Sequence, residues 1–136
     1  MPVQVEIISP EKVLVSRQVD MAVLPGMEGD IAAMPEHAPM MLLLRGGVVA
    51  LYEGETVTDR YFVGGGFADI TPDRCTVLAD RAVPVSDISI DNATAQLEAL
   101  SEAWDKADKT DTTRLGVLQD QILAVRAEIE AGTGTL

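Results

Sequence analysis

The hydrophobic pattern of the chain changes its period once, and this change constrains the fold more than any other feature. Up to Pro84 the apolar residues alternate with polar ones or form short β-branched runs, as in strands that bury one face. After Pro84 they recur every three to four residues, which is the repeat of an amphipathic helix. The sequence therefore predicts a β unit followed by a helical unit, with the boundary at 85–87.

Turn signals cut residues 1–86 into about ten runs of strand length. The clearest sets are Val3, Val5, Ile7, which alternate with polar residues, and Val13, Val15, Val19, which share a face. The breaks fall at 9–11, 25–26, 45–47, 53–55, 64–66 and 71–73. Most connections are short enough for hairpins, which favours a sandwich or barrel.

The helical region carries two apolar seams. They consist of Ile90, Ala93, Leu97, Leu100, Trp104, Ala107 and of Leu115, Leu118, Ile122, Val125, Ile129. Because the polar segment 108–112 between them is short, the helices are expected to pack antiparallel. Gly116 costs the second helix about 1 kcal/mol relative to alanine, so the pair should depend on docking to the sandwich or to a partner.

Charge and composition exclude several classes of function. The net charge of −12 disfavours nucleic acid and anionic lipid as partners and leaves a basic protein surface possible. Cys75 is the only cysteine, so it is expected to be a small core residue, without a disulfide or a cysteine metal cluster. The apolar run Met40–Leu44 is far shorter than the ~20 residues of a spanning helix, and direct membrane insertion is not expected. The first six residues lack the pattern of a secretory signal, which predicts a cytoplasmic chain.

The segment 23–40 concentrates turn formers, acids and the only histidine. Its Pro and Gly residues predict tight turns that present Glu28, Asp30 and Glu36 at a polar loop tip, with His37 nearby. His37 has no visible nucleophile or metal-ligand set around it, so a catalytic or metal site is disfavoured. The glycine run 64–66 precedes a strand pattern instead of a helix, which favours a bulge or close backbone approach over a phosphate cradle.

Two ordered blocks resemble a known family. The first reads Leu24-Pro25-Gly26, Glu28-Gly29 and Pro35-Glu36-His37-Ala38-Pro39-Met40. The second reads Phe62-Val63-Gly64-Gly65-Gly66-Phe67-Ala68-Asp69-Ile70, then Thr76-Val77-Leu78-Ala79-Asp80. In order and spacing they are similar to the epsilon subunit of bacterial F-type ATP synthases, strongly over 1–86 and only in architecture over 87–136. The resemblance implies a flattened β-sandwich domain (1–86) and an antiparallel two-helix hairpin domain (87–136).

The same resemblance implies a non-catalytic rotor subunit in the central stalk. Such a subunit packs one side of its sandwich on gamma, which predicts an apolar patch of more than a few hundred Å2, and joins gamma to the c ring, coupling proton transport to ATP synthesis. Glu28, Asp30, Glu36 and His37 fall where the family has its ring-facing loop. The expected location is the cytoplasmic face of the inner membrane, as a peripheral part of the complex.

Many family members bind ATP through an Ile or Leu followed by Asp-x-x-Arg-Ala at the start of the first helix. Here the segment contains Ile90, Asp91, Thr94 and Ala95, so Thr94 stands in place of the arginine. Losing the forked, charged donor predicts weak or absent ATP binding, and no other cofactor is expected. Asp91 is then interpreted as a helix cap or as a first-turn charge that compensates the helix dipole.

Family hairpins can also reach the alpha and beta subunits and inhibit hydrolysis. Residues 87–136 contain ten acids and four bases, so insertion against an acidic surface is unfavourable and the hairpin is expected to be structural or weakly regulatory. Two alternatives to the rotor subunit are a nucleotide-sensing sandwich with a helical hairpin and a small enzyme that uses His37 with nearby carboxylates. Thr94 counts against the first, and the missing catalytic constellation counts against the second.

Overall fold

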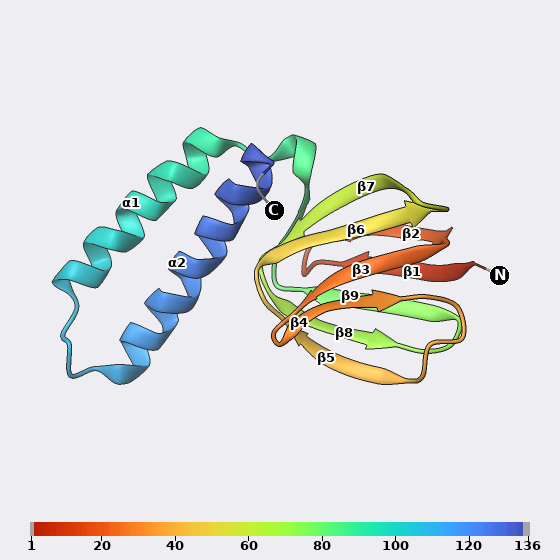
Figure 1. The fold of residues 1–136 in the computed structure, drawn as a ribbon. Coiled ribbons are helices and arrows are strands. Elements are labelled where there is room, and N and C mark those ends of the chain that lie inside the picture. The colour runs from red at the N-terminus through yellow and green to blue at the C-terminus, as the bar shows by residue number, and fades with distance from the viewer. Residues whose placement is uncertain (1, 135–136) are drawn as a thin grey trace.

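The structure, a computed structural model that describes residues 2–134, places a two-layered β unit beside a pair of helices (Figure 1). The strands are β1 (Val3–Ile8), β2 (Val13–Val19), β3 (Met21–Gly26), β4 (Gly29–Ala33), β5 (Met40–Leu44), β6 (Gly47–Glu53), β7 (Thr56–Val63), β8 (Gly66–Ile70), β9 (Arg74–Ala79) and β10 (Ala82–Pro84). A 3-10 turn, η1 (Val85–Asp87), leads into α1 (Ile90–Lys106) and α2 (Thr112–Thr133). The predicted fold class is confirmed. The division into domains 1–86 and 87–136 stays a prediction.

The strands form one sheet that folds back on itself. Its order is β10-β7-β6-β3-β5-β8-β9-β1-β2, with β4 paired only to β3. The bend falls between β3 and β5, which share the single pair Gly26 and Leu44. Within the order only β1 and β9 run parallel; the other pairs are antiparallel. The last strand, β2, comes back beside β6, so the sandwich is nearly closed.

Aliphatic side chains fill the space between the two layers. On β1 the alternation is strict: Val3, Val5 and Ile7 are fully buried, as the pattern predicts. The core also contains Val15, Val19, Ala22, Leu24, Ala33, Leu44, Val49, Leu51, Val63, Ala68, Ile70, Cys75, Val77 and Ala79. Phe62 is also buried, outside this cluster, and it lines a small cavity together with Val125 of α2.

The helical pair packs on the sandwich through α2, and α1 lies on the outer side of α2 (Figure 1). A Cβ on Gly46, in the turn between β5 and β6, would lie 3.2 Å from Ala124 Cα and 3.4 Å from Ala127 Cβ. Arg81 forms an ion pair with Glu128, a carboxylate that α2 buries against the sandwich. Small residues and one ion pair therefore dock the hairpin closely.

Local capping explains where the helices begin. Ser89 caps α1 by accepting a hydrogen bond from the Asn92 backbone N–H, and Asp111 caps α2 in the same way from Arg114. In the turn between the helices, Asp108 accepts bonds from the Thr110 backbone and hydroxyl, and these bonds lower the pKa of Asp108. Ser89 is the cap, so capping by Asp91 is wrong, whereas its position in the first turn of α1 is the one that the dipole interpretation predicts.

Candidate functional site: an acidic hairpin tip and an apolar outer stripe

Strands β3 and β4 form a hairpin whose end, residues 26–30, is called the hairpin tip below. The chain reverses at Met27 and Glu28, both exposed, so the turn comes one residue after the break predicted at 25–26. Glycine is required on both sides. A Cβ on Gly26 would lie 2.5 Å from the Gly29 carbonyl oxygen, and Gly29 has a φ of 139°.

Arg45, which follows β5, holds this tip from the side. Its Nη1 donates to the Gly26 carbonyl oxygen at 2.5 Å, and its Nη2 donates to Asp30 Oδ1 at 2.6 Å. The pair is partly solvated, since the side chains of Arg45 and Asp30 are 42% and 61% exposed. Sequence reasoning missed Arg45, because the pairing depends on strands brought together by the fold.

Glu36 and His37 lie at the other end of the sandwich, in the 34–39 loop. β4 separates this loop from the hairpin tip, and its five residues span about 16 Å at the usual strand rise. The Glu36 backbone N–H donates to the Pro72 carbonyl, and His37 Nδ1 lies 2.6 Å from the Ala38 carbonyl oxygen. The expectation of one loop tip with all four residues is therefore wrong: Glu28 and Asp30 form one site, and Glu36 and His37 another.

A groove of about 480 Å³ runs between the hairpin tip and β5. Its lining residues are Gly26, Met27, Glu28, Gly29, Asp30, Ile31, Met40, Met41, Leu42 and Leu43. Met41 and Leu43 are each 67% exposed. The groove thus combines an apolar wall from β5 with acidic groups at the tip.

The outer face of five strands carries an apolar stripe. Direct cross-strand pairs connect its members: Leu43 with Phe67, Phe67 with Leu78, Leu78 with Ile8, and Ile8 with Val13. Ile8 is half-buried and the other four side chains are exposed. Large apolar side chains grouped on a surface are typical of protein interfaces. The predicted patch area stays a prediction, but the stripe gives its position.

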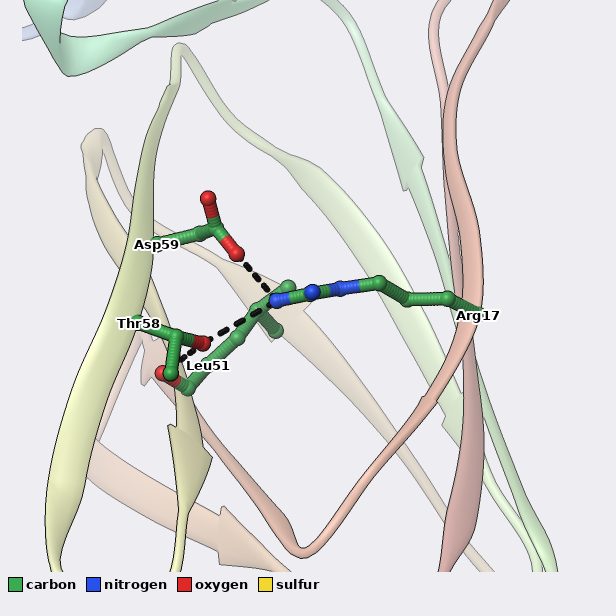
Figure 2. A network of polar contacts seen from close by, with 4 residues as sticks. All are labelled: Arg17, Leu51, Thr58 and Asp59. Atoms are coloured by element: carbon green, nitrogen blue, oxygen red, sulfur yellow. Dashed lines mark hydrogen bonds and ion pairs between the residues drawn. The ribbon is translucent and has the colours of Figure 1, made fainter.

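The sandwich is closed by a second polar network, drawn in Figure 2. Arg17 of β2 forms an ion pair with Asp59 of β7 and donates to the Thr58 hydroxyl at 3.0 Å, and that hydroxyl donates to the Leu51 carbonyl at 3.3 Å. Burial and the Asp59 carboxylate raise the pKa of neighbouring Tyr61, and the Arg17 guanidinium opposes them.

The degenerate nucleotide segment forms no enclosed site. Ile90, Asp91, Thr94 and Ala95 are all exposed on the first turns of α1. Ile90 lies against α2, because a Cβ on Gly132 would come within 3.2 Å of Ile90 Cγ1. The segment therefore presents an open helix surface to solvent, and it lacks the arginine that would bind phosphate.

No group of three or more His, Cys, Asp or Glu side chains within residues 2–134 is arranged to hold a metal ion. The glycine run 64–66 behaves as its pattern predicts. Gly65 and Gly66 have φ values of 119° and 124°, and a Cβ on Gly66 would overlap the Leu78 carbonyl oxygen. The close approach between β8 and β9 therefore requires glycine at Gly66, and the positive φ favours glycine at Gly65.

Comparison with known proteins agrees with these features. The family described as the ATP synthase delta/epsilon chain, β-sandwich domain, matches residues 2–85. The chain belongs to this family. An ATP synthase epsilon chain from Gluconacetobacter diazotrophicus is 60% identical over 134 residues, covering 98% of this chain and 95% of the relative. One from Granulibacter bethesdensis is 52% identical and covers 93% of each chain.

Solved structures share the fold at low identity. A chain in the Euglena gracilis mitochondrial ATP synthase (OSCP/F1/c-ring) aligns with a TM-score of 0.73 at 16% identity, covering 93% of this chain and 80% of that one. A chain in the Tetrahymena thermophila mitochondrial ATP synthase (central stalk/c-ring) aligns at 0.67 and 11%, covering 97% of each. The resemblance seen in the sequence is confirmed.

As a member of the delta/epsilon family, the chain is a non-catalytic subunit of ATP synthase and takes part in ATP synthesis and ion transport. No helix among the described residues is long and apolar enough to cross a bilayer.

Proposed function

We propose that the chain is a central-stalk rotor component that joins the gamma subunit to the c ring of a proton-translocating ATP synthase. Proton-driven rotation of the ring then turns gamma in the catalytic head, where ATP is made. The supporting observation is the position of Leu43, which belongs both to the apolar stripe and to the wall of the tip groove. The apolar stripe and the acidic groove therefore adjoin each other on one rigid β-sandwich, as an adaptor between two partners requires.

The apolar stripe is the proposed gamma-facing surface. Its five side chains lie in register on neighbouring strands, so a partner that covers Phe67 also reaches Leu43 and Leu78. Backbone hydrogen bonds on both sides of each inner strand hold the stripe rigid, which lowers the entropic cost of binding.

The acidic groups are the proposed ring-facing surface. The hairpin tip carries Glu28 and Asp30, and the 34–39 loop carries Glu36 and His37 at the opposite end. Since the two sites are separated, we assign the ring contact to the tip, whose groove continues into the apolar stripe through Leu43. Charge complementarity with basic ring loops then guides register and association rate more than affinity.

The proposed location is the cytoplasmic face of the bacterial inner membrane, where the chain is held by its protein partners. The net charge of −12 supports attachment through protein, because anionic lipid headgroups repel it.

The proposed role of the hairpin is structural or weakly regulatory, with contact to alpha and beta at most secondary. The docked arrangement supports this, because leaving it would expose Phe62 and separate the buried Glu128 from Arg81. Truncation after Ser86, with assembly verified, should barely change the ATP hydrolysis rate of the complex. A several-fold rise would refute the weak role.

ATP binding is proposed to be weak or absent. Asp91 and Thr94 are exposed on α1 and supply no cation for phosphate. Isothermal titration of the full chain with ATP tests this, and micromolar affinity that is lost in Asp91→Asn would favour the nucleotide-sensing alternative.

Co-purification tests the rotor assignment directly. The full chain is mixed with purified gamma and, separately, with a gamma–c-ring subcomplex. The wild type should bind both, and Leu43→Arg should lose gamma, since a cation would enter the apolar stripe. Val117→Arg, on an exposed apolar position of α2, is the control and should bind normally. Failure of the wild type to bind gamma or the ring ends the proposal.

A further inference from the structure

We infer that Arg45 positions the hairpin tip through Asp30, and that Glu28 supplies the carboxylate that recognises a basic side chain of the partner protein. The inference rests on the proposed function, because it assigns roles within the surface that meets the ring. It separates two acids that sequence reasoning treated as equivalent.

Arg45 is itself fixed in place by the backbone around it. Its N–H donates to the Pro25 carbonyl oxygen at 3.0 Å, and its neighbour Leu44 pairs with Gly26 across the bend of the sheet. On the other side, a Cβ on Gly47 would lie 2.7 Å from Pro25 Cβ, and Gly46 meets Ala124 of α2. The guanidinium therefore extends from a turn that is wedged between the tip and the docked helix.

One guanidinium satisfies two groups on opposite sides of the hairpin tip. The Gly26 carbonyl belongs to the end of β3, and the Asp30 carboxylate belongs to the start of β4. Arg45 therefore fixes how the turn between them lies against β5. A forked donor can do this, whereas a single ammonium can satisfy both groups only with poorer geometry.

Asp30 is consequently the ion-pair partner of Arg45 within the same chain. Its charge is compensated by Arg45 at 2.6 Å, which reduces the field it presents to an approaching cation. Among the described residues, no side chain forms an ion pair or hydrogen bond with Glu28, which lies exposed at the lip of the groove. Glu28 is thus the uncompensated carboxylate of the tip.

The groove fits a lysine or arginine side chain on a partner loop. The aliphatic stem of such a side chain can lie along Met27 and Met41 while its charged end reaches Glu28. Methionine side chains adapt readily to the shape of such a stem. The net charge of −12 adds a long-range attraction for a basic partner.

The test compares five variants of the full chain: Glu28→Gln, Asp30→Asn, Arg45→Met, Arg45→Lys and the double variant Asp30→Asn/Arg45→Met. Affinity for the gamma–c-ring subcomplex is measured over a range of salt concentrations. In parallel, backbone amide NMR shifts of residues 26–30 are recorded for each free variant. Glu53→Gln, which changes an exposed acid at the end of β6, is the control and should match the wild type.

Glu28→Gln should weaken binding about two- to fivefold, the range of an exposed ion pair, and reduce its salt dependence without moving the tip amide shifts. Asp30→Asn and Arg45→Met should both move those shifts, and the double variant, which removes a compensated pair, should keep the wild-type salt dependence. The double variant should bind no more weakly than either single variant, because both remove one contact. Arg45→Lys should recover part of the affinity.

Loss of salt dependence in the double variant equal to that in Glu28→Gln overturns the division of roles, because the double variant removes no net charge. Unchanged tip shifts in Arg45→Met overturn the positioning role, whether or not the ring binds. If the wild type binds no ring, the proposed function fails, while the NMR result still decides how the tip is held.

Discussion

Arg81, in the turn between β9 and β10, forms an ion pair with Glu128 of α2 that connects the sandwich to the hairpin. The Glu128 side chain is only 6% exposed, whereas that of Arg81 is 55% exposed. The pair lies beside Phe62 and Val125, so the carboxylate is held in mostly apolar surroundings with Arg81 as its ionic partner. Hairpin docking is therefore sensitive to the cation.

Arg81→Met should weaken docking more than Glu128→Gln does. Removing the cation leaves a buried carboxylate uncompensated, whereas glutamine removes the charge and keeps a hydrogen-bonding group. Because Arg81 is half-exposed, the expected loss is about 1–2 kcal/mol, below the range for fully buried pairs. Hydrogen exchange of α2 amides measures the docking.

Arg114→Met, on the exposed start of α2, serves as the matched control and should leave α2 exchange unchanged. Equal α2 exchange rates in Arg81→Met and the wild type would contradict a role of the ion pair in docking. The contacts of Ala124 and Ala127 with Gly46 would then be sufficient to dock the hairpin.

Removal of Arg17 should loosen the closure between β2 and β7. The Arg17 and Asp59 side chains are each 38% exposed, so Arg17→Met is expected to cost about 1 kcal/mol or less of unfolding free energy. It should also raise the pKa of Tyr61 further, because the guanidinium that lowers it is lost while Asp59 remains. Phenolate absorbance against pH, in a Tyr52→Phe background, measures this.

Arg60→Met on the same strand is the control for Arg17→Met. Its side chain is exposed, and no ion pair or side-chain hydrogen bond involves it among the described residues. A pKa of Tyr61 that falls, or stays constant, in Arg17→Met would contradict the influence of the Arg17 guanidinium on Tyr61.

Local periodicity was enough to predict most elements, but it failed where the register slips. The pattern predicts that Val13 shares a face with Val15 and Val19, yet Val13 is exposed, because Leu14 of β2 is an extra residue opposite the step from Ile7 to Ile8 of β1. One extra residue moves a side chain to the opposite face. That shift brings Val13 into the apolar stripe, which the sequence did not reveal.

The candidate site shows a second limit of sequence reasoning. Asp30 and Glu36 are six positions apart, which predicts one shared loop tip, but β4 separates them to opposite ends of the sandwich. Arg45 is fifteen positions from Asp30 and contacts it. Such ion pairs follow from tertiary structure, and neither motif spacing nor charge patterning encodes them.

Cys75 should be unreactive in the folded chain. It is fully buried in the core, and burial, followed by the charge of Asp69, raises the pKa of its thiol to about 12. At pH 9 about one thiol in a thousand is then ionised, against about half of unperturbed thiols with a pKa of 9.0. Labelling with a thiol reagent should require unfolding, and rapid labelling of the native chain would contradict this burial.

The same shift sets a pH dependence of stability. The thiol pKa is higher in the folded state than in the unfolded state, so the folded chain keeps its proton where the unfolded chain loses it. The contribution is complete below pH 9 and is lost as the pH rises towards about 12. Cys75→Ala should show a shallower decline in unfolding free energy across this window than the wild type.

Gly116→Ala should stabilise the chain. Gly116 lies within α2, and a Cβ there meets nothing within 4 Å, so alanine adds helix propensity without a clash. The expected gain is about 1 kcal/mol in the free energy of unfolding by denaturant. If the hairpin unfolds separately from the sandwich, the gain is measured as slower hydrogen exchange of the α2 amides. Gly132→Ala, in the same helix, is the matched contrast, because its Cβ would come within 2.9 Å of Ile88 Cγ2 and offset the gain. Equal stabilisation by both substitutions would contradict the packing of α2 against the segment that precedes α1.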